Sequence, residues 1–260
     1  PSVLRLKYHG RSNEDFDIDF AILQIECRRK YAKKLSETLS AAPRFIFPDK
    51  LVAEQSTSDA LGQWHASIVK NCESVIDLTA GLGIDVFHIA HKVDKVVAVE
   101  IDPLRAATLL HNASVLGLTN VEVVCADCRE IISAANQQSY DAAFIDPARR
   151  ASDGGRVFAL ADCSPDVVSL QTDILRISRR LVVKMSPMLD ITHTLRELPT
   201  AVEVQAIGTT TECKELVAIA DRYASERKVL SAVTISSSVA KVVSSIIDSE
   251  FSTEEIYGMP

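Results

Sequence analysis

Through the middle of the chain, short apolar runs alternate with segments in which apolar residues recur at the spacing of a helix. The runs lie within residues 75–77, 96–102, 121–127, 140–146 and 180–187. Such short, continuous runs are typical of parallel strands that helices cover on both faces. Further strands are predicted at 202–209 and 215–221, close enough for a hairpin, and at 229–235. The pattern therefore predicts an α/β fold of five βα units followed by an antiparallel pair.

The flanking regions predict smaller additions to this core. Apolar residues at helical spacing over about residues 14–41 predict an all-α N-terminal appendage that ends near Ala42-Pro43. A further helix is expected over 58–70 with Thr57 or Ser58 as its N-cap, and another helix should carry Pro165 in its first turn. We expect three parts, namely a small helical N-terminal appendage (1–50), a main domain (51–223) and a C-terminal extension (224–260).

The segment after the first predicted strand has the composition of a ligand-binding turn. From Asp77 to Asp85 it reads DLTAGLGID. Glycine at positions 81 and 83 allows a tight turn and a close approach of the backbone to a ligand, because no Cβ is present. The helix that follows would direct its first amides to the same place. A small polar ligand is therefore expected at this turn.

An acidic residue at the end of the second strand indicates an adenosine-containing cofactor. Glu100 lies 17 residues after Gly83, where dinucleotide-type folds place the carboxylate that accepts the ribose hydroxyls. The third glycine of the NAD fingerprint is replaced by Phe87 or a close neighbour, and a bulky residue there closes the approach that a pyrophosphate needs. Asp77 is placed to receive an ammonium group. These features favour S-adenosylmethionine over NAD.

These segments resemble the class I S-adenosylmethionine-dependent methyltransferases. Residues 77–83 are similar to the first motif of that family, 100–103 to its ribose-binding acid, 121–127 to its third strand, and 140–150 to its fourth strand and catalytic loop. The resemblance implies a Rossmann-like sheet of seven strands in the order 3-2-1-4-5-7-6. It also implies cofactor contacts at Gln55, Thr57, Asp77, Thr79, Ala80, Gly81, Gly83, Asp85, Glu100, Ile101 and Asp127.

The loop after the fourth strand bears on the methyl acceptor. Methyltransferases that act on base nitrogens commonly carry Asn/Asp/Ser-Pro-Pro-aromatic there, whereas this chain has Asp146-Pro147-Ala148-Arg149. The resemblance implies that the acid and the following carbonyl accept hydrogen bonds from the target amine. Arg149 could stack through its guanidinium plane or pair with a phosphate. The catalytic candidates are Asp146, Pro147 and Arg149, and the expected acceptor is a nitrogen of an RNA base.

A narrower resemblance is to bacterial RNA methyltransferases with a THUMP-like domain, relatives of trimethylguanosine synthase. It rests on residues 54–58, 77–85 and 146–150. A THUMP-like segment usually follows the catalytic core in that family, and only a short extension follows it here, so we expect a truncated chain. The resemblance also implies that residues 54–58 fold over the methionine end of the cofactor, with a helix N-cap and turn as the alternative.

Composition and charge narrow the class of protein. The chain is 47% hydrophobic, enough to bury an α/β core, and it has no signal peptide and no run long enough to span a membrane, so we expect a cytoplasmic protein. A net charge of −7 excludes a broad basic surface, so contact with RNA would be local. Cys125 and Cys128 form half a zinc site at best, and the histidines lack metal-ligand spacing, so no metal is expected.

Other interpretations stay open beside the RNA methyltransferase. A binding module that keeps the cofactor but has lost the chemistry would account for Ala148 and Arg149 in place of proline and an aromatic residue. A methyltransferase could also act on a protein or a small molecule. An aminopropyl transferase or an NAD-dependent oxidoreductase would use the same fold. The oligomeric state is not predicted.

Overall fold

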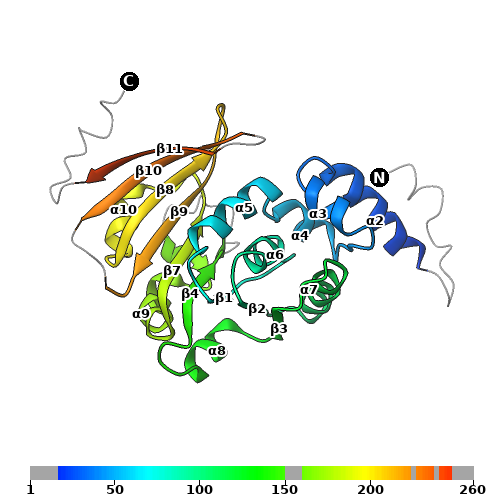
Figure 1. The fold of residues 1–260 in the computed structure, drawn as a ribbon, viewed down its shortest axis with the longest axis horizontal. Coiled ribbons are helices and arrows are strands. Elements are labelled where there is room, and N and C mark those ends of the chain that lie inside the picture. Colours follow the sequence, from blue (N-terminus) through cyan, green and yellow to red (C-terminus); the bar gives the residue numbers. More distant parts are fainter. Residues whose placement is uncertain (1–16, 150–159, 224–226, 237–239, 248–260) are drawn as a thin grey trace. The chain divides into compact units, whose positions relative to one another are not determined.

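The computed structural model describes residues 17–149, 160–223, 227–236 and 240–247. Helices and strands alternate along these residues, so the prediction of an α/β fold is confirmed (Figure 1). The chain forms two compact units. One contains Pro1–Asn71 and Ala80–Asp127, and the other contains Cys72–Thr79 and Cys128–Pro260.

The first unit consists of helices and one parallel pair of strands. Its helices are α2 (Ile18–Tyr31), α3 (Ser36–Ala41), α4 (Lys50–Gln55), α5 (Asp59–Ile68), α6 (Ile84–Ala90) and α7 (Pro103–Val115), and its strands are β2 (Lys95–Glu100) and β3 (Val121–Cys125). The two strands pair with Val96 opposite Val121 and Glu100 opposite Cys125. Helices α6 and α7 contact both strands. All of β2 after Lys95 is buried, as expected for a strand covered on both faces.

The second unit contains most of the sheet. Its strands are β1 (Ser74–Asp77), β4 (Tyr140–Ile145), β7 (Ser178–Met185), β8 (Ala201–Gly208), β9 (Cys213–Asp221), β10 (Lys228–Ile235) and β11 (Ala240–Ile247), and they lie in the order β11-β10-β8-β9-β7-β4-β1. Strands β1, β4 and β7 are parallel, and β9 is antiparallel to β7 and to β8. Strand β10 runs parallel to β8, and β11 antiparallel to β10.

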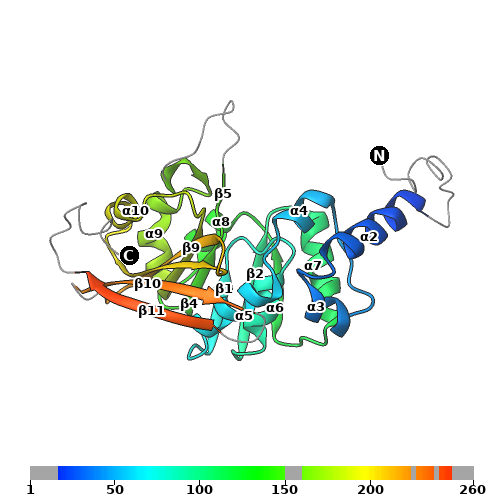
Figure 2. The ribbon, with the colours of Figure 1, turned by 90° about the horizontal axis from the view of Figure 1, so that it is seen from above.

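Three helices and a small second sheet complete this unit. The helices are α8 (Cys128–Ala134), α9 (Val167–Ile177) and α10 (Ile191–Glu197), with a single 3-10 turn at Leu160–Asp162. Figure 2 shows α9 and α10 on the same side of strands β10 and β11. Strands β5 (Ala148–Arg149) and β6 (Cys163–Ser164) pair antiparallel as a separate sheet, and β5 lies within the predicted catalytic loop.

The predicted number of strands is wrong. Among the described residues the main sheet has nine strands, two in the first unit and seven in the second, rather than seven in all. The predicted hairpin is confirmed as β8 and β9, and the strand expected at 229–235 is β10. Strand β11 was not predicted because its sequence, AKVVSSII, does not alternate apolar with polar residues, and all but its last residue are exposed.

The helical region predicted over about residues 14–41 contains two separate helices, α2 and α3. Residues 14–16 lie outside the described part, and the break follows α2. Asp59 of α5 contacts the chain at this break, where its N–H donates to the carbonyl of Lys34 at 3.0 Å. The Asp59 carboxylate accepts the N–H of Glu37 at 2.8 Å and of Thr38 at 3.2 Å, which caps a helix that has no side-chain cap of its own.

The two helix starts predicted from capping residues had different outcomes. Ser58 is confirmed as the N-cap of α5, because its hydroxyl accepts the N–H of Leu61 at 3.3 Å. Pro165 does not lie in the first turn of α9. That helix begins at Val167 with Asp166 as N-cap, whose carboxylate accepts the N–H of Ser169 at 3.2 Å. An aspartate caps better than proline can, since it supplies an acceptor to the unpaired amides.

Two side-chain amides hold the segment from Phe45 to Phe47 between α2 and α7. Gln24 donates to the carbonyl of Phe47 at 2.9 Å and accepts its N–H at 2.8 Å. Asn112 makes the same pair of bonds to Ile46, both at 2.9 Å. The buried rings of Phe45 and Phe47 lie 5.3 Å apart, edge to face. The segment thus joins helices that are far apart in sequence.

We expect the substitution Asn112→Ala to lower the free energy of unfolding by about 2 kcal/mol, because it removes two hydrogen bonds and leaves backbone groups of Ile46 unpaired. Urea denaturation followed by circular dichroism measures this. The control is His111→Ala, which removes one exposed contact to the carbonyl of Arg44 and should cost less than about 1 kcal/mol. Equal losses in the two variants would contradict the role of Asn112.

The Asp59 carboxylate has a pKa below its ordinary value. Burial alone would raise the pKa, but hydrogen bonds from His88 and from Thr38 and Glu37 outweigh the burial and lower it. Since the pKa in the folded state lies below that in the unfolded state, the carboxylate stabilises the fold above the unfolded pKa. This stabilisation is lost as the pH falls through the folded pKa.

The substitution Asp59→Asn should therefore lower the free energy of unfolding at pH 7 by about 2 kcal/mol. The difference from wild type should shrink below the unfolded pKa of about 4. Denaturation curves at pH 7, 5, 4 and 3 test both points. Asp94→Asn, at an exposed position, is the control and should change stability by less than about 0.5 kcal/mol throughout. A difference that does not depend on pH would rule out the charge as the cause.

Candidate functional site

The glycine turn has the backbone conformation that the sequence predicts. Gly81 has φ 55° and Gly83 has φ 90°, both in the left-handed region that favours glycine. The turn is closed by the N–H of Gly83, which donates to the carbonyl of Ala80 at 2.9 Å. A Cβ on Gly83 would lie 2.6 Å from the ring of Phe87. Phe87 is buried beneath the turn, with its ring 6.2 Å from that of Phe45.

Glu100 closes the other side of this turn. Its carboxylate accepts the N–H of Gly81 at 2.9 Å and the N–H of Asp102 at 2.9 Å. Ile101 is 64% exposed although it is aliphatic. The N–H of Ala126 donates to the carbonyl of Glu100 at 3.2 Å, so Asp127 follows directly beside these residues. An apolar surface next to carboxylates fits the base and the hydroxyls of an adenosine.

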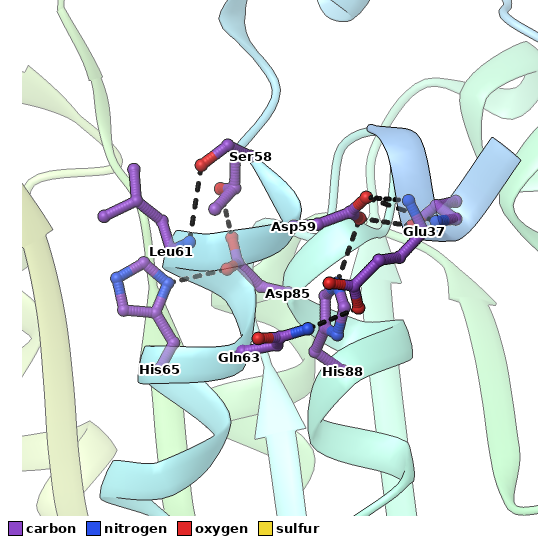
Figure 3. Close-up of polar contacts among 10 residues, drawn as sticks. Glu37, Ser58, Asp59, Leu61, Gln63, His65, Asp85 and His88 are labelled. Carbon is purple, nitrogen blue, oxygen red and sulfur yellow. Dashed lines mark hydrogen bonds and ion pairs between the residues drawn. The ribbon is translucent and has the colours of Figure 1, made fainter. Parts of the chain in front are cut away.

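Asp85 is buried, and its carboxylate is engaged inside the protein. It accepts the hydroxyl of Thr57 at 2.6 Å and lies 2.7 Å from Nδ1 of His65 (Figure 3). Thr57 and Asp85, both predicted as cofactor contacts, are thus brought together. Gln55 is exposed at the end of α4. That these three residues contact the cofactor stays a prediction.

Helices α5 and α6 exchange two Asp–His pairs (Figure 3). Asp85 of α6 pairs with His65 of α5, and Asp59 of α5 lies 3.1 Å from Nε2 of His88 on α6. Gly62 makes room for the second pair, because a Cβ there would lie 2.5 Å from the ring of His88. Sequence reasoning missed both pairs. The signal for them is that each helix carries one aspartate and one histidine.

The second unit holds two predicted cofactor contacts, Asp77 and Thr79, and the catalytic candidate Asp146 at the carboxyl ends of β1 and β4. The Asp77 carboxylate accepts the N–H of Thr79 at 2.9 Å, and the Thr79 hydroxyl accepts the N–H of Asp146 at 2.7 Å. The strands pair with Asp77 opposite Phe144. Ligands of α/β sheets commonly bind beyond the carboxyl ends of parallel strands. Asp77, Thr79 and Asp146 therefore form one continuous polar group there.

Lys184, near the end of β7, adds a charge that the sequence analysis did not identify. Its ammonium lies 2.7 Å from the Asp146 carboxylate. The Lys184 side chain is 7% exposed and that of Asp146 is 46% exposed. A buried ammonium needs a carboxylate partner, and Asp146 supplies it. A lysine directly after the apolar run Leu181-Val182-Val183 is the signal that could have identified it.

The remaining candidates add less to the site. Pro147 is buried, and Arg149 lies in β5, with its side chain outside the described part. In the described residues no group of three His, Cys, Asp or Glu side chains could hold a metal ion, and the cysteines, Cys125 and Cys128 among them, are free thiols. Over that same part of the chain, no helix has the length and apolar character needed to cross a membrane.

Comparisons with known proteins agree with this geometry. Residues 72–179 match the model of a family described as RNA cap guanine-N2 methyltransferase. Two uncharacterized S-adenosylmethionine-dependent methyltransferases, from strains CDC 1551 and H37Rv of Mycobacterium tuberculosis, are each 31% identical to the chain over 167 residues, which is 63% of this chain and 43% of the relative. The predicted cofactor is thus the one named for these relatives.

Solved structures support the same assignment of the fold. A candidate methyltransferase from Porphyromonas gingivalis W83 superposes with a TM-score of 0.79 and 26% identity, over 94% of this chain and 60% of that protein. A candidate class I S-adenosylmethionine-dependent methyltransferase from Listeria monocytogenes is similar to this chain in fold only. Its TM-score is 0.54 and its identity 12%, over 84% of this chain and 76% of the Listeria protein. The chain spans less than two thirds of the mycobacterial and Porphyromonas proteins. It has the Rossmann-like α/β fold of the class I S-adenosylmethionine-dependent methyltransferases.

Proposed function

We propose that this protein transfers a methyl group from S-adenosylmethionine to a nitrogen of an RNA base, with the exocyclic N2 of guanine as the first candidate. One observation carries the proposal. The segment that matches the RNA cap guanine-N2 methyltransferase model, residues 72–179, includes both the glycine turn and Asp146. With a net charge of −7, the contact with RNA is local. The kinship with THUMP-like RNA methyltransferases and the cytoplasmic location belong to the same proposal.

The cofactor would be held by residues that suit its three parts. Asp77 and the backbone from Thr79 to Gly83 would hold the methionine end, since a carboxylate complements an ammonium group and backbone amides complement a carboxylate. Glu100 would accept the ribose hydroxyls, and Ile101 and Asp127 would line the adenine. When bound, the cofactor supplies a methyl group on a positively charged sulfur.

Asp146 is the residue that we place at the acceptor. One carboxylate oxygen lies against Lys184, and the second would accept a hydrogen bond from the target amine, which turns the nitrogen lone pair toward the methyl group. The N–C bond forms as the S–C bond breaks, the sulfur keeps the electron pair, and the amine then releases its extra proton. Asp146 thereby orients the nucleophile, and proximity contributes most of the rate.

A second candidate is a protein that binds the cofactor without transferring the methyl group. It is favoured by Ala148, an exposed and small residue at a position where base methyltransferases commonly carry proline followed by an aromatic residue. An alanine offers no surface on which a base can stack. The two candidates differ in turnover but share the cofactor.

Turnover and binding can be separated with Asp146→Ala. We expect kcat to fall by about 100-fold or more, because the amine loses its acceptor. The Kd for S-adenosylhomocysteine should stay within about threefold of wild type, since Asp146 faces the acceptor rather than the cofactor. Transfer RNA, ribosomal RNA and a guanosine cap analogue serve as methyl acceptors. Mass spectrometry of the nucleosides measures turnover, and calorimetry measures the Kd.

The outcomes distinguish the candidates. A wild-type protein that binds the cofactor but methylates none of the acceptors supports the binding module. Loss of cofactor binding in Asp146→Ala, in proportion to the loss of turnover, shows that the role assigned to Asp146 is wrong. Binding of NAD in place of the sulfonium cofactor contradicts the whole proposal.

Lys184→Met tests whether the ammonium matters for turnover. We expect kcat to fall by about tenfold, because the Asp146 carboxylate loses the hydrogen-bond partner that holds it in place. Lys184→Arg should recover part of this loss, since it retains the positive charge. The matched control is Arg180→Met, at a position on the same strand as Lys184. It removes an ion pair with Asp221 of β9 and should leave kcat unchanged. Equal activity of Lys184→Met and wild type would show that the pair is structural only.

A further inference from the structure

The two Asp–His pairs between α5 and α6 have the same chemistry but different positions. Asp85 is the second residue after Gly83, whereas His88 lies a further turn along α6. Figure 3 shows His65 and His88 on opposite sides of the helix contact, each facing the carboxylate of the other helix. The pair of His65 and Asp85 is therefore the one next to the glycine turn.

The Asp85 carboxylate also accepts a hydrogen bond from Thr57, which lies just before α5. The Thr57 hydroxyl donates to one oxygen of the Asp85 carboxylate at 2.6 Å, and Nδ1 of His65 lies 2.7 Å from the other oxygen. An ionised carboxylate has no proton to donate, so Nδ1 carries the proton of this hydrogen bond. The His65 ring is fully buried. One carboxylate thus joins Thr57, the middle of α5 and the first turn of α6.

The other pair connects different elements. The Asp59 carboxylate receives the N–H groups of Glu37 and Thr38 in addition to the ring of His88. It therefore ties α3 to α5 and α6. The substitution His88→Phe removes this part-buried hydrogen bond and should leave the contacts of Asp85 with Thr57 and His65 in place.

We propose that His65 is a positioning residue of the cofactor site. It fixes the Asp85 carboxylate, which holds Thr57 against the first turn of α6 and so keeps the Gly81 to Gly83 turn in the geometry that binds the cofactor. His65 acts through Asp85, whose carboxylate lies 2.7 Å from its Nδ1. This inference rests on the proposed use of S-adenosylmethionine.

The reason for the effect is the cost of a buried carboxylate that loses a donor. Without the imidazole, one oxygen of Asp85 loses a donor that lies 2.7 Å away, and the buried carboxylate then competes for N–H groups of the neighbouring turn. A turn that donates to Asp85 is no longer arranged for a ligand. The effect is therefore expected in cofactor affinity as well as in stability.

Calorimetric titration with S-adenosylhomocysteine tests this on four variants, with urea denaturation of each. His65→Phe keeps a ring but removes the donor and should raise the Kd by about tenfold or more. His65→Asn places an amide nitrogen where Nδ1 lies and should restore the Kd to within about threefold of wild type. His88→Phe is the matched control, which should lose stability to a similar extent while its Kd stays within about threefold.

Thr57→Val keeps the shape of the side chain and removes its hydroxyl, so it tests the same link if His65→Phe does not fold. Its Kd should rise by about threefold to tenfold. The inference is overturned if the folded His65→Phe or Thr57→Val protein binds as wild type does, or if His88→Phe weakens binding as much as His65→Phe. A wild-type protein that binds neither S-adenosylmethionine nor its product overturns the proposed function, and this inference with it.

Discussion

Buried carboxylates need hydrogen-bond donors, and this requirement shapes the parts of the chain that matter for function. Asp59, Asp77, Asp85 and Glu100 are all buried. Each finds its donors in the backbone or side chains of a turn or helix start: Glu37 and Thr38 for Asp59, Thr79 for Asp77, Thr57 and His65 for Asp85, and Gly81 and Asp102 for Glu100. An unpaired buried charge is costly, so each acid fixes the conformation of the segment that serves it.

The same requirement links the fold to the chemistry. The glycine turn is fixed at two places. The Glu100 carboxylate accepts the N–H of Gly81, and Gly83 lies closely against the ring of Phe87. At the carboxyl ends of β1 and β4, Thr79 holds the backbone of Asp146 while Lys184 holds its side chain. The carboxylate of Asp146 is nevertheless half exposed, which leaves it accessible to an acceptor. A fixed and charged group that still faces solvent is what an orienting residue requires.

The N-terminal helices take part in this arrangement rather than standing apart from it. Within the first unit, Gln24 and Asn112 hold the segment around Phe47, and Phe45 packs against Phe87 beneath the glycine turn. Asp59 then connects α3 to α6 through His88. The helix that follows the turn is therefore supported by residues from three earlier helices, and the turn inherits its rigidity from their packing.

The sequence by itself determined the fold class, the first strands, the glycine turn and the acids beside it. These depend on local rules, because apolar runs, left-handed glycines and residues at strand ends follow from the chain within a few positions. The break between α2 and α3, the two Asp–His pairs and the Lys184 contact were decided only by the tertiary structure. Their partners are 38 residues apart for Lys184 and Asp146, and 28 for Thr57 and Asp85. Pairing over such distances is set by which side chains are buried together, and local spacing carries no record of that.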